Sequence, residues 1–460
     1  MSEATVKSNS AERFLGTEKI SRLLVKFSVP CVLSMLVSAL YNIVDQVFIG
    51  RGVGYLGNAA TTVVYPFTVI ALAFALLIGD GSAALFSLSL GRGEKETAHK
   101  SIGNSLILLL IAAVLLTGAG FVFEDQLLTL FGVTEGAYQY AREYMTVICA
   151  GIPFYMVTST LNGIIRADGS PAYAMVATVV GALINLILDP VAIFVLDMGV
   201  KGAAWATILG QIVTGILSVV YLFRTKLFRL SKASFKPEKG ICVQILRLGL
   251  TSLIIQISIV IVMSVANNLI GKYGPLSVYG ADIPLSAIGI VMKVFAIVIA
   301  FAVGVSVGGQ PIVGYNYGAK NYDRVRETHR LITIINCLIG IVSMLLFECA
   351  PQAIINIFGN ENELYNTYSR LCFRIFLSGI LLCCIQKSGS IFLQSIGKPV
   401  QSTILSMSRD VIFFVPALLL ITPRFGVVGM LWAAPVADVL AGGLTVFLIV
   451  REFRNMQVNV

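Results

Sequence analysis

A carboxylate followed by a helix breaker lies inside one of the long apolar stretches of this chain. Residues 183–190 read Leu-Ile-Asn-Leu-Ile-Leu-Asp-Pro, so Asn185 and Asp189 are four positions apart. On a helix such residues share one face, and Pro190 has no N–H and frees the carbonyl of Leu186 from its helical bond. Charge and unpaired backbone are both costly in lipid. The motif therefore indicates a site that handles an ion.

Two more residues belong at the same depth. Asp45 lies about five residues before the outer end of the first apolar run, and Thr207 lies about five residues after the outer start of the sixth. At a rise of about 1.5 Å per residue, the depths of Asp45, Asp189 and Thr207 agree within roughly 3 Å. Two carboxylates, an amide and a hydroxyl would form an oxygen-rich site suited to Na⁺ or a shared proton. Repulsion between neighbouring carboxylates also favours proton uptake.

The elements that must position these residues are membrane helices. The chain has 460 residues, of which 57% are hydrophobic and 12% charged, and a soluble domain carries about twice that charged fraction. Runs of about 20 apolar residues can cross a hydrocarbon core, where only helices satisfy the backbone in segments of this length. We expect an all-α polytopic membrane protein with twelve transmembrane helices. They fall at 23–50, 58–90, 101–123, 142–165, 172–196, 202–223, 245–270, 282–317, 331–350, 370–395, 401–422 and 427–450.

The two halves of the chain repeat. Gly91 and Gly318 are 227 positions apart, as are Trp205 and Trp432, whereas the first spans are offset by 221. Each half has an even number of spans, so we expect two pseudo-symmetric six-helix lobes related by an axis along the membrane normal. The predicted division is an N-terminal tail 1–22, an N-lobe 23–223, a basic linker 224–243, a C-lobe 244–450 and a tail 451–460.

Basic residues gather in alternate loops, including the N-terminal tail, the loop before residue 101 and the linker. By the rule for cytoplasmic loops, both termini should face the cytoplasm of a cell (inner) membrane. This distribution explains the net charge of +9 without nucleic acid as a partner. The eight cysteines lack metal-ligand spacing and only two histidines are present, so we expect neither a disulfide framework nor a metal centre other than Na⁺.

Several other polar residues are candidates for the cleft or for substrate contact: Tyr41, Asp80, Asn162 and Lys293. Lys387 and Asp438 could line the cleft or pair within their lobe, because buried ions usually find partners. Arg409-Asp410 is expected to be an interfacial pair, and residues 166–171 a tight turn. The second half lacks the acidic site, since Asp45 aligns with Ala266 and Thr207 with Ala434.

Several motifs resemble those of the MATE (multidrug and toxic compound extrusion) transporters, most of all the bacterial MepA-type members near the DinF-like branch. They cover the chain from about residue 15 and are Tyr41-Asn-Ile-Val-Asp45-Gln, Gly163-Ile-Ile-Arg166-Ala-Asp-Gly-Ser-Pro171, Asn185-Leu-Ile-Leu-Asp189-Pro190, Gly202-Ala-Ala-Trp-Ala-Thr207 and Gln310-Pro311-Ile-Val-Gly-Tyr-Asn316-Tyr-Gly318.

The resemblance implies a two-lobed fold, alternating access and export of bulky, often cationic, amphipathic compounds driven by inward flow of H⁺ or Na⁺. Family cation-site residues carry over onto Asp45, Asn185, Asp189 and Thr207. The acidic C-lobe residues of the NorM-like branch are not evident, and Lys293 lies in the eighth span instead. Coupling through the N-terminal lobe is therefore favoured.

The expected function is a secondary active multidrug antiporter that needs no cofactor beyond the coupling ion H⁺ or Na⁺. Its partners would be small-molecule drugs, organic cations and membrane lipids, and it would act as a monomer. The alternative is a flippase for a lipid-linked or amphipathic metabolite, whose cleft should carry Arg and Lys for pyrophosphate. An enzyme or channel finds no supporting motif, and no ATP-binding loop motif occurs.

Overall fold

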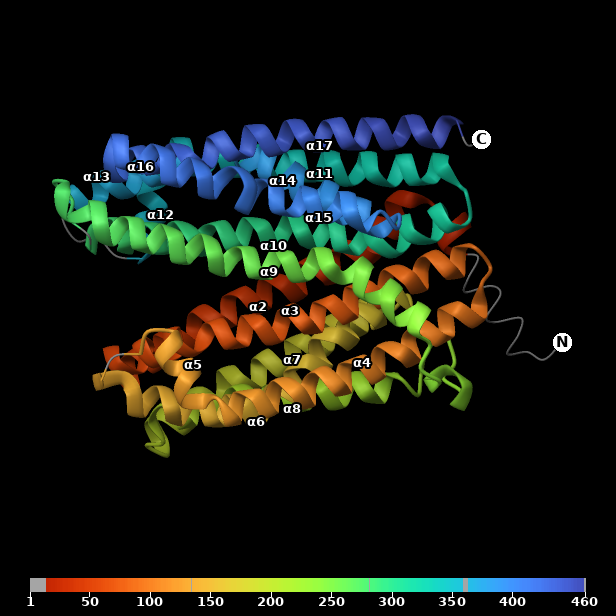
Figure 1. Ribbon diagram of the computed structural model, residues 1–460, viewed down its shortest axis with the longest axis horizontal. Coiled ribbons are helices and arrows are strands. Elements are labelled where there is room, and N and C mark those ends of the chain that lie inside the picture. The colour runs from red at the N-terminus through yellow and green to blue at the C-terminus, as the bar shows by residue number, and fades with distance from the viewer. Residues whose placement is uncertain (1–13, 134, 281, 359–362, 459–460) are drawn as a thin grey trace.

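The computed structural model describes residues 14–133, 135–280, 282–358 and 363–458. The part of the predicted N-terminal tail before residue 14 lies outside them. The described chain is helical and contains no strand. Its helices form two bundles side by side, α2–α8 and α9–α17 (Figure 1). The start of α2 and the end of α17 lie at the same end of the molecule, which we call the termini side; the opposite end is the distal side (Figure 1).

The first bundle contains all four residues of the predicted ion site. Its elements are α2 (Ile20–Gly52), α3 (Tyr55–Gly91), α4 (Lys95–Val122), α5 (Glu124–Leu130), α6 (Glu135–Ala167), α7 (Pro171–Pro190), the π-helix η1 (Val191–Val195) and α8 (Gly199–Tyr221).

A linker with the short helix η2 (Lys232–Phe235) leads to the second bundle. Its elements are α9 (Lys239–Tyr273), η3 (Gly274–Leu276), α10 (Asp282–Gly318), α11 (Tyr322–Cys349), α12 (Pro351–Phe358), α13 (Glu363–Leu371), η4 (Cys372–Phe376), α14 (Ile380–Ser395), α15 (Pro399–Met407), η5 (Ser408–Phe414), α16 (Val415–Gly429), η6 (Met430–Trp432) and α17 (Ala433–Val458).

The helix lengths agree with a membrane-spanning chain. Ten described helical stretches are long and apolar enough to cross a membrane, and a pair bent by 48°, Glu363–Phe376 with Ile380–Ser395, supplies an eleventh. The last stretch, Pro399–Met456, holds 58 residues. It is broken at Gly426, where φ is +65°, and α17 runs back beside α15 and α16 (Figure 1). The predicted all-α fold with twelve spans is therefore confirmed.

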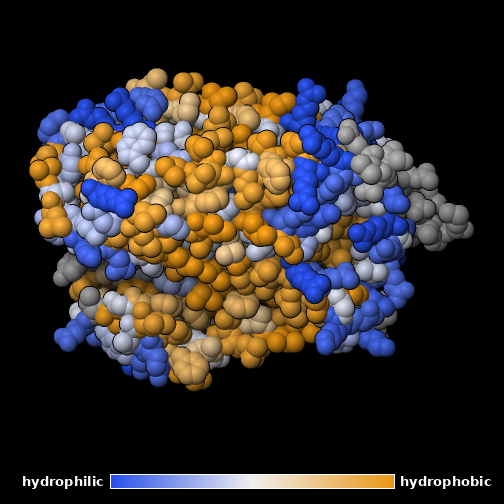
Figure 2. All heavy atoms as spheres, turned by 45° about the horizontal axis from the view of Figure 1, so that its top comes forward, coloured by the Kyte–Doolittle hydropathy of each residue, from blue (hydrophilic) through white to orange (hydrophobic). Residues whose placement is uncertain are grey.

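On the face shown in Figure 2, an apolar belt lies between two hydrophilic ends. Its outward-facing side chains include Val114, Leu115 and Val446, which are 70%, 66% and 56% exposed. A surface of this kind is stable only against lipid. The protein is thus a multi-pass membrane protein.

The lobes meet through α2 packed on α10 and α3 packed on α9 and α10. The buried residues of α2 run from Ile20 to Ser34, with Ile49 beyond them. Polar side chains on the distal halves of the interfacial helices are exposed: Asn42 and Gln46 on α2, and Ser264, Asn267 and Asn268 on α9. Exposed amides on such apolar helices indicate contact with water rather than lipid. The lobes are therefore joined on the termini side and open to water on the distal side.

The segment predicted as a tight turn also anchors the linker. Asp168 is fully buried and accepts hydrogen bonds from the Tyr221 hydroxyl at 2.6 Å and the backbone N–H groups of Lys226 and Leu227 at 2.8 and 2.7 Å. Burial raises the pKa of the Asp168 carboxyl to about 6, against the opposing effect of these hydrogen bonds. Asp168 thus ties the start of the linker to the first lobe.

Candidate cation site in the first lobe

Helix α7 presents Asn185 and Asp189 to the interior of the first lobe. Its buried residues follow one face of the helix and end with these two, which are 3% and 0% exposed. Leu183 and Ile187 on the other face are 50% and 62% exposed. Directly after Asp189 the chain continues through Pro190 into the π-helix η1, an irregularity common at functional sites.

Close packing of α7 on α8 brings Thr207 to Asn185. A Cβ atom at Gly210 of α8 would lie 2.6 Å from the backbone oxygen of Gly181 in α7, so glycine is needed here for the two backbones to approach. Asn185 Nδ2 donates to Asp189 Oδ1 at 3.2 Å and to Thr207 Oγ1 at 3.3 Å. One amide nitrogen carries two hydrogens, so both bonds can form together.

Asp45 of α2 completes the group. Its carboxyl lies within hydrogen-bonding reach of the Asp189 carboxyl. Asp45 Oδ1 and Asp189 Oδ2 are buried and have no hydrogen-bond partner among the described residues. Two ionised carboxylates are both acceptors, so their contact becomes a hydrogen bond only when one holds a proton. The site can accept a proton between the carboxyls or a small cation against their free oxygens.

Two further side chains lie beside the carboxyls. Tyr41 is one helical turn before Asp45 on α2, and its ring is close to both aspartates and to Gln211 of α8. Gln211 Oε1 is a buried acceptor with no partner within the described chain. Sequence reasoning missed Gln211, although it follows Thr207 by four positions and so shares its helix face.

Asp80 and Asn162 do not join this site. They lie nearer the termini side, where Arg166 Nη2 is 3.5 Å from Asp80 Oδ1. Arg166 also donates to Asn162 Oδ1, and Asn162 Nδ2 donates to Thr178 Oγ1 at 3.1 Å. Lys293, half-buried on α10, has no ion-pair partner among the residues that the structure describes.

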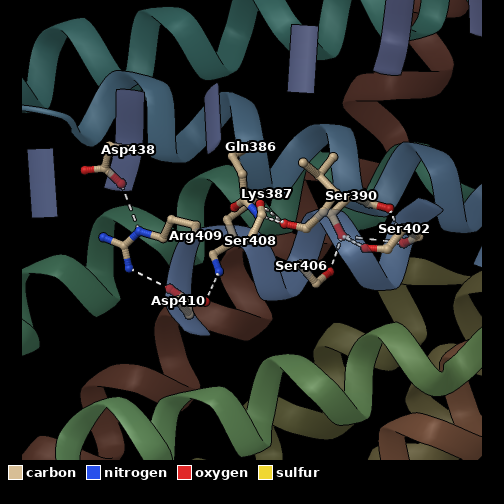
Figure 3. Close-up of polar contacts among 10 residues, drawn as sticks. Gln386, Lys387, Ser390, Ser402, Ser406, Ser408, Arg409, Asp410 and Asp438 are labelled. Carbon is tan, nitrogen blue, oxygen red and sulfur yellow. Dashed lines mark hydrogen bonds and ion pairs between the residues drawn. The ribbon is translucent and has the colours of Figure 1, made fainter. Parts of the chain in front are cut away.

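The second lobe contains a closed ionic network instead of an open acidic pair (Figure 3). Lys387 Nζ donates to Asp410 Oδ2 at 2.7 Å, and Arg409 donates to Asp410 Oδ1 at 2.7 Å and to Asp438 Oδ1 at 2.9 Å. These side chains are at most 8% exposed. The prediction that Arg409 and Asp410 form a pair at the membrane–water interface was therefore wrong. The π-helix η5 directs both side chains inward, to Asp438 and Lys387. The two cations and two carboxylates give the network a net charge of zero.

The contrast between the lobes defines the candidate site. In the second lobe, Asp410 and Asp438 are each held by a cation of the same lobe. The described first lobe offers Asp45 and Asp189 no such cation, and its partly buried Arg166 is paired with Asp80. Free carboxylate oxygens at membrane depth are the feature expected of a coupling site.

The comparisons with known proteins agree with this architecture. The family model MatE matches residues 30–191 and 253–419. The chain is 25% identical over 453 residues to the "Multidrug export protein MepA" of Staphylococcus haemolyticus, covering 96% of each chain. It is 25% identical over 349 residues to the "Probable multidrug resistance protein YoeA" of Bacillus subtilis, covering 73% of each.

Among solved structures, the fold is similar to one described as the outward-facing conformation of a multidrug resistance MATE family transporter of the MOP superfamily. The TM-score is 0.89 at 24% identity, with 96% of this chain and 98% of the other covered. The family model, the relatives and the fold agree. The chain belongs to the MATE family of transporters, in its MepA-like branch.

Proposed function

We propose that this protein is a secondary active antiporter that exports amphipathic, often cationic, small molecules in exchange for H⁺ or Na⁺. The relatives described as multidrug export proteins support the cargo class. The observation that carries the proposal is the pair of buried, unpartnered oxygens on Asp45 and Asp189.

In this proposal, ion binding is linked to movement of the lobes through α2. Asp45 belongs to α2 and Asp189 to α7, so a proton or cation between them draws α2 towards the interior of the first lobe. The same α2 packs on α10 of the second lobe. An ion held by both aspartates therefore changes the relative stability of the lobe arrangements, by as much as its affinity differs between them.

The termini side is assigned to the cytoplasm. The basic residues of the linker and of the loops at Arg92–Lys100 and Lys320–Arg330 gather there, as cytoplasmic loops of membrane proteins require. In the arrangement described, the acidic site would thus be reached from outside the cell. Coupling ions would enter the site there, and cargo would leave on the same side.

The test is transport in proteoliposomes that contain the protein and a fluorescent cationic dye, without ATP. A pH gradient is imposed with and without Na⁺, and a Na⁺ gradient is imposed at constant pH. Dye movement driven by either gradient supports the proposal and identifies the ion. Movement insensitive to both gradients, with exchange of a labelled lipid between leaflets, would indicate the flippase alternative.

A further inference from the structure

Glycines bring the backbones of the two lobes into contact on the termini side, first where α3 meets α9. A Cβ atom at Gly249 of α9 would lie 1.7 Å from the carbonyl oxygen of Leu77 in α3, and one at Gly81 would lie 2.2 Å from that of Ile245. No side-chain rearrangement can relieve such clashes, because the obstructing atoms are main chain. Any residue other than glycine must push α3 and α9 apart.

The second contact joins the ends of α3 and α10. A Cβ atom at Gly318 would lie 2.2 Å from the oxygen of Leu88, and one at Gly91 would lie 2.0 Å from that of Tyr315. Gly91 and Gly318 are 227 positions apart, and so are Leu88 and Tyr315. The two clashes are thus copies of one another under the internal repeat. We call Gly81, Gly91, Gly249 and Gly318 the glycine seam.

A side-chain hydrogen bond joins α9 to α3 beside the seam. Ser252 of α9 donates its hydroxyl to Asp80 Oδ2 at 2.8 Å. On the second-lobe side, Gln394 donates to Ser252 Oγ at 3.2 Å and to the Leu248 carbonyl at 2.8 Å. Asp80 is thus held by Arg166 in its own lobe and by Ser252 across the interface.

The ion pairs at membrane depth each join residues of one lobe: Asp80 with Arg166, Lys387 and Arg409 with Asp410, and Arg409 with Asp438. When the lobes part here, Asp80 keeps its cation and Ser252 keeps Gln394. Separation of the lobes therefore leaves no buried charge unpaired. An ion pair that crossed the interface would be broken by the same movement and would leave unpaired buried charges, at a high cost in free energy.

We propose that the glycine seam and the Asp80–Ser252 hydrogen bond form the inner gate of the transporter. The gate seals the path on the termini side while the acidic site is open on the distal side, and it opens by separation of α3 from α9 and α10. This inference rests on the proposed alternating-access function. The test below measures conformation rather than transport, so the gate proposal can be refuted without refuting the antiporter function.

The experiment uses the full-length protein in proteoliposomes, with its native cysteines replaced and spin labels on introduced cysteines. One pair, at Glu94 and Val400, reports the termini side; a second pair, at Leu130 and Ile357, reports the distal side. All four positions are exposed. Distance distributions by pulsed electron paramagnetic resonance are compared between the parent and its variants.

Gly249→Ala is the principal variant, and Gly271→Ala on the same helix is its matched control, since a Cβ atom at Gly271 meets no atom within 4 Å. We expect Gly249→Ala to lengthen the Glu94–Val400 distance and shorten the Leu130–Ile357 distance. Gly271→Ala should reproduce the parent distributions. Equal distributions for the two variants would overturn the proposal.

Ser252→Ala keeps the seam and removes only the hydroxyl, so it remains informative if Gly249→Ala does not fold. Loss of a hydrogen bond to a charged group should raise the population open on the termini side about tenfold. Ser264→Ala, at an exposed position of α9, should leave it unchanged. An unchanged population in Ser252→Ala would overturn the assignment of the Asp80–Ser252 hydrogen bond to the gate. Gradient-driven transport in the parent would meanwhile leave the antiporter function standing.

Discussion

Asp189 on α7 lies beside Asp45 on α2, and each carboxyl keeps one buried oxygen that no described residue satisfies. The two residues are 144 positions apart in the chain. The contact joins the interior of the first lobe to a helix that packs against the second lobe. Under the proposed function, an ion bound between these carboxyls would therefore influence both lobes.

Replacing either aspartate with asparagine should abolish gradient-driven export. A carboxamide cannot take up a proton and supplies no charge for Na⁺, so we expect Asp45→Asn and Asp189→Asn each to slow dye export at least about tenfold. Dye efflux from proteoliposomes measures this. The control is Asp197→Asn, an exposed aspartate at φ +50°, a conformation that asparagine also adopts. Full activity in both site variants would refute the assignment.

Asn185 should be needed to orient the site rather than to bind the ion alone. Asn185→Ala removes the donor to Asp189 and Thr207, and loss of a hydrogen bond to a charged group should reduce transport about tenfold. Thr207→Val removes a single bond to a neutral group and should have a smaller effect. Initial export rates at several gradient strengths distinguish the two, and a larger defect in Thr207→Val would contradict the geometry.

The closed network of the second lobe should contribute stability. Lys387→Met leaves Asp410 with one cation and the network with a net negative charge, which should cost about 3–5 kcal/mol. The double variant Lys387→Met, Asp410→Asn removes that charge and should recover part of the loss. Thermal unfolding in detergent can be followed with a thiol-reactive dye, because Cys383 and Cys384 are buried free thiols.

The matched control for this network is Arg374→Met, which breaks a pair with Glu348 whose partners are 52% and 48% exposed. Its expected cost is below about 1 kcal/mol. If Lys387→Met and Arg374→Met lowered the melting temperature equally, the buried network would contribute no more to stability than an exposed ion pair does.

Asp168 should make stability depend on mildly acidic pH. Its folded pKa of about 6 lies above its ordinary value of 3.8, so the folded protein binds a proton that the unfolded chain releases between these values. Wild-type stability should therefore fall as pH rises from about 4 to 6, by at most about 3 kcal/mol. Asp168→Asn lacks this titration. Circular dichroism melts should show the difference between wild type and variant shrinking over this range, and a constant difference would contradict the prediction.

The first-lobe cluster could be predicted from sequence because its signals are local. Asn185 and Asp189 share a helix face by spacing, and depth counting placed Asp45 and Thr207 beside them. Arg409 and Asp410 could not be placed in this way. Adjacent residues on an ordinary helix point in different directions, and the π-helix η5 that directs both inward has no clear mark in the sequence.

Asp80 and Asn162 also show where spacing stops being informative. Both are polar residues in apolar spans. The partners of Asp80, Arg166 and Ser252, lie on α6 and α9, whereas Asn162 bonds to Arg166 on its own helix and to Thr178 on α7. The choice of a partner on another helix depends on how the helices pack. Of the glycine seam, the sequence pointed only to Gly91 and Gly318, through their equivalent positions in the two halves. The sequence does not reveal that each glycine lies against a main-chain oxygen of the other lobe, because this contact depends on how the helices pack.

The reciprocal contacts of Gly91 with Tyr315 and of Gly318 with Leu88 impose a joint constraint on the duplicated halves. A side chain acquired at either glycine would displace the backbone of the other half, so neither copy can vary there independently. The positions of the acid pair and of the ionic network, Asp45, Asp189, Arg409 and Asp410, take part in no such reciprocal contact. Descendants of one ancestral six-helix unit could thus acquire an open acid pair in one copy and a neutral ionic cluster in the other, while the surface on which they meet stayed fixed.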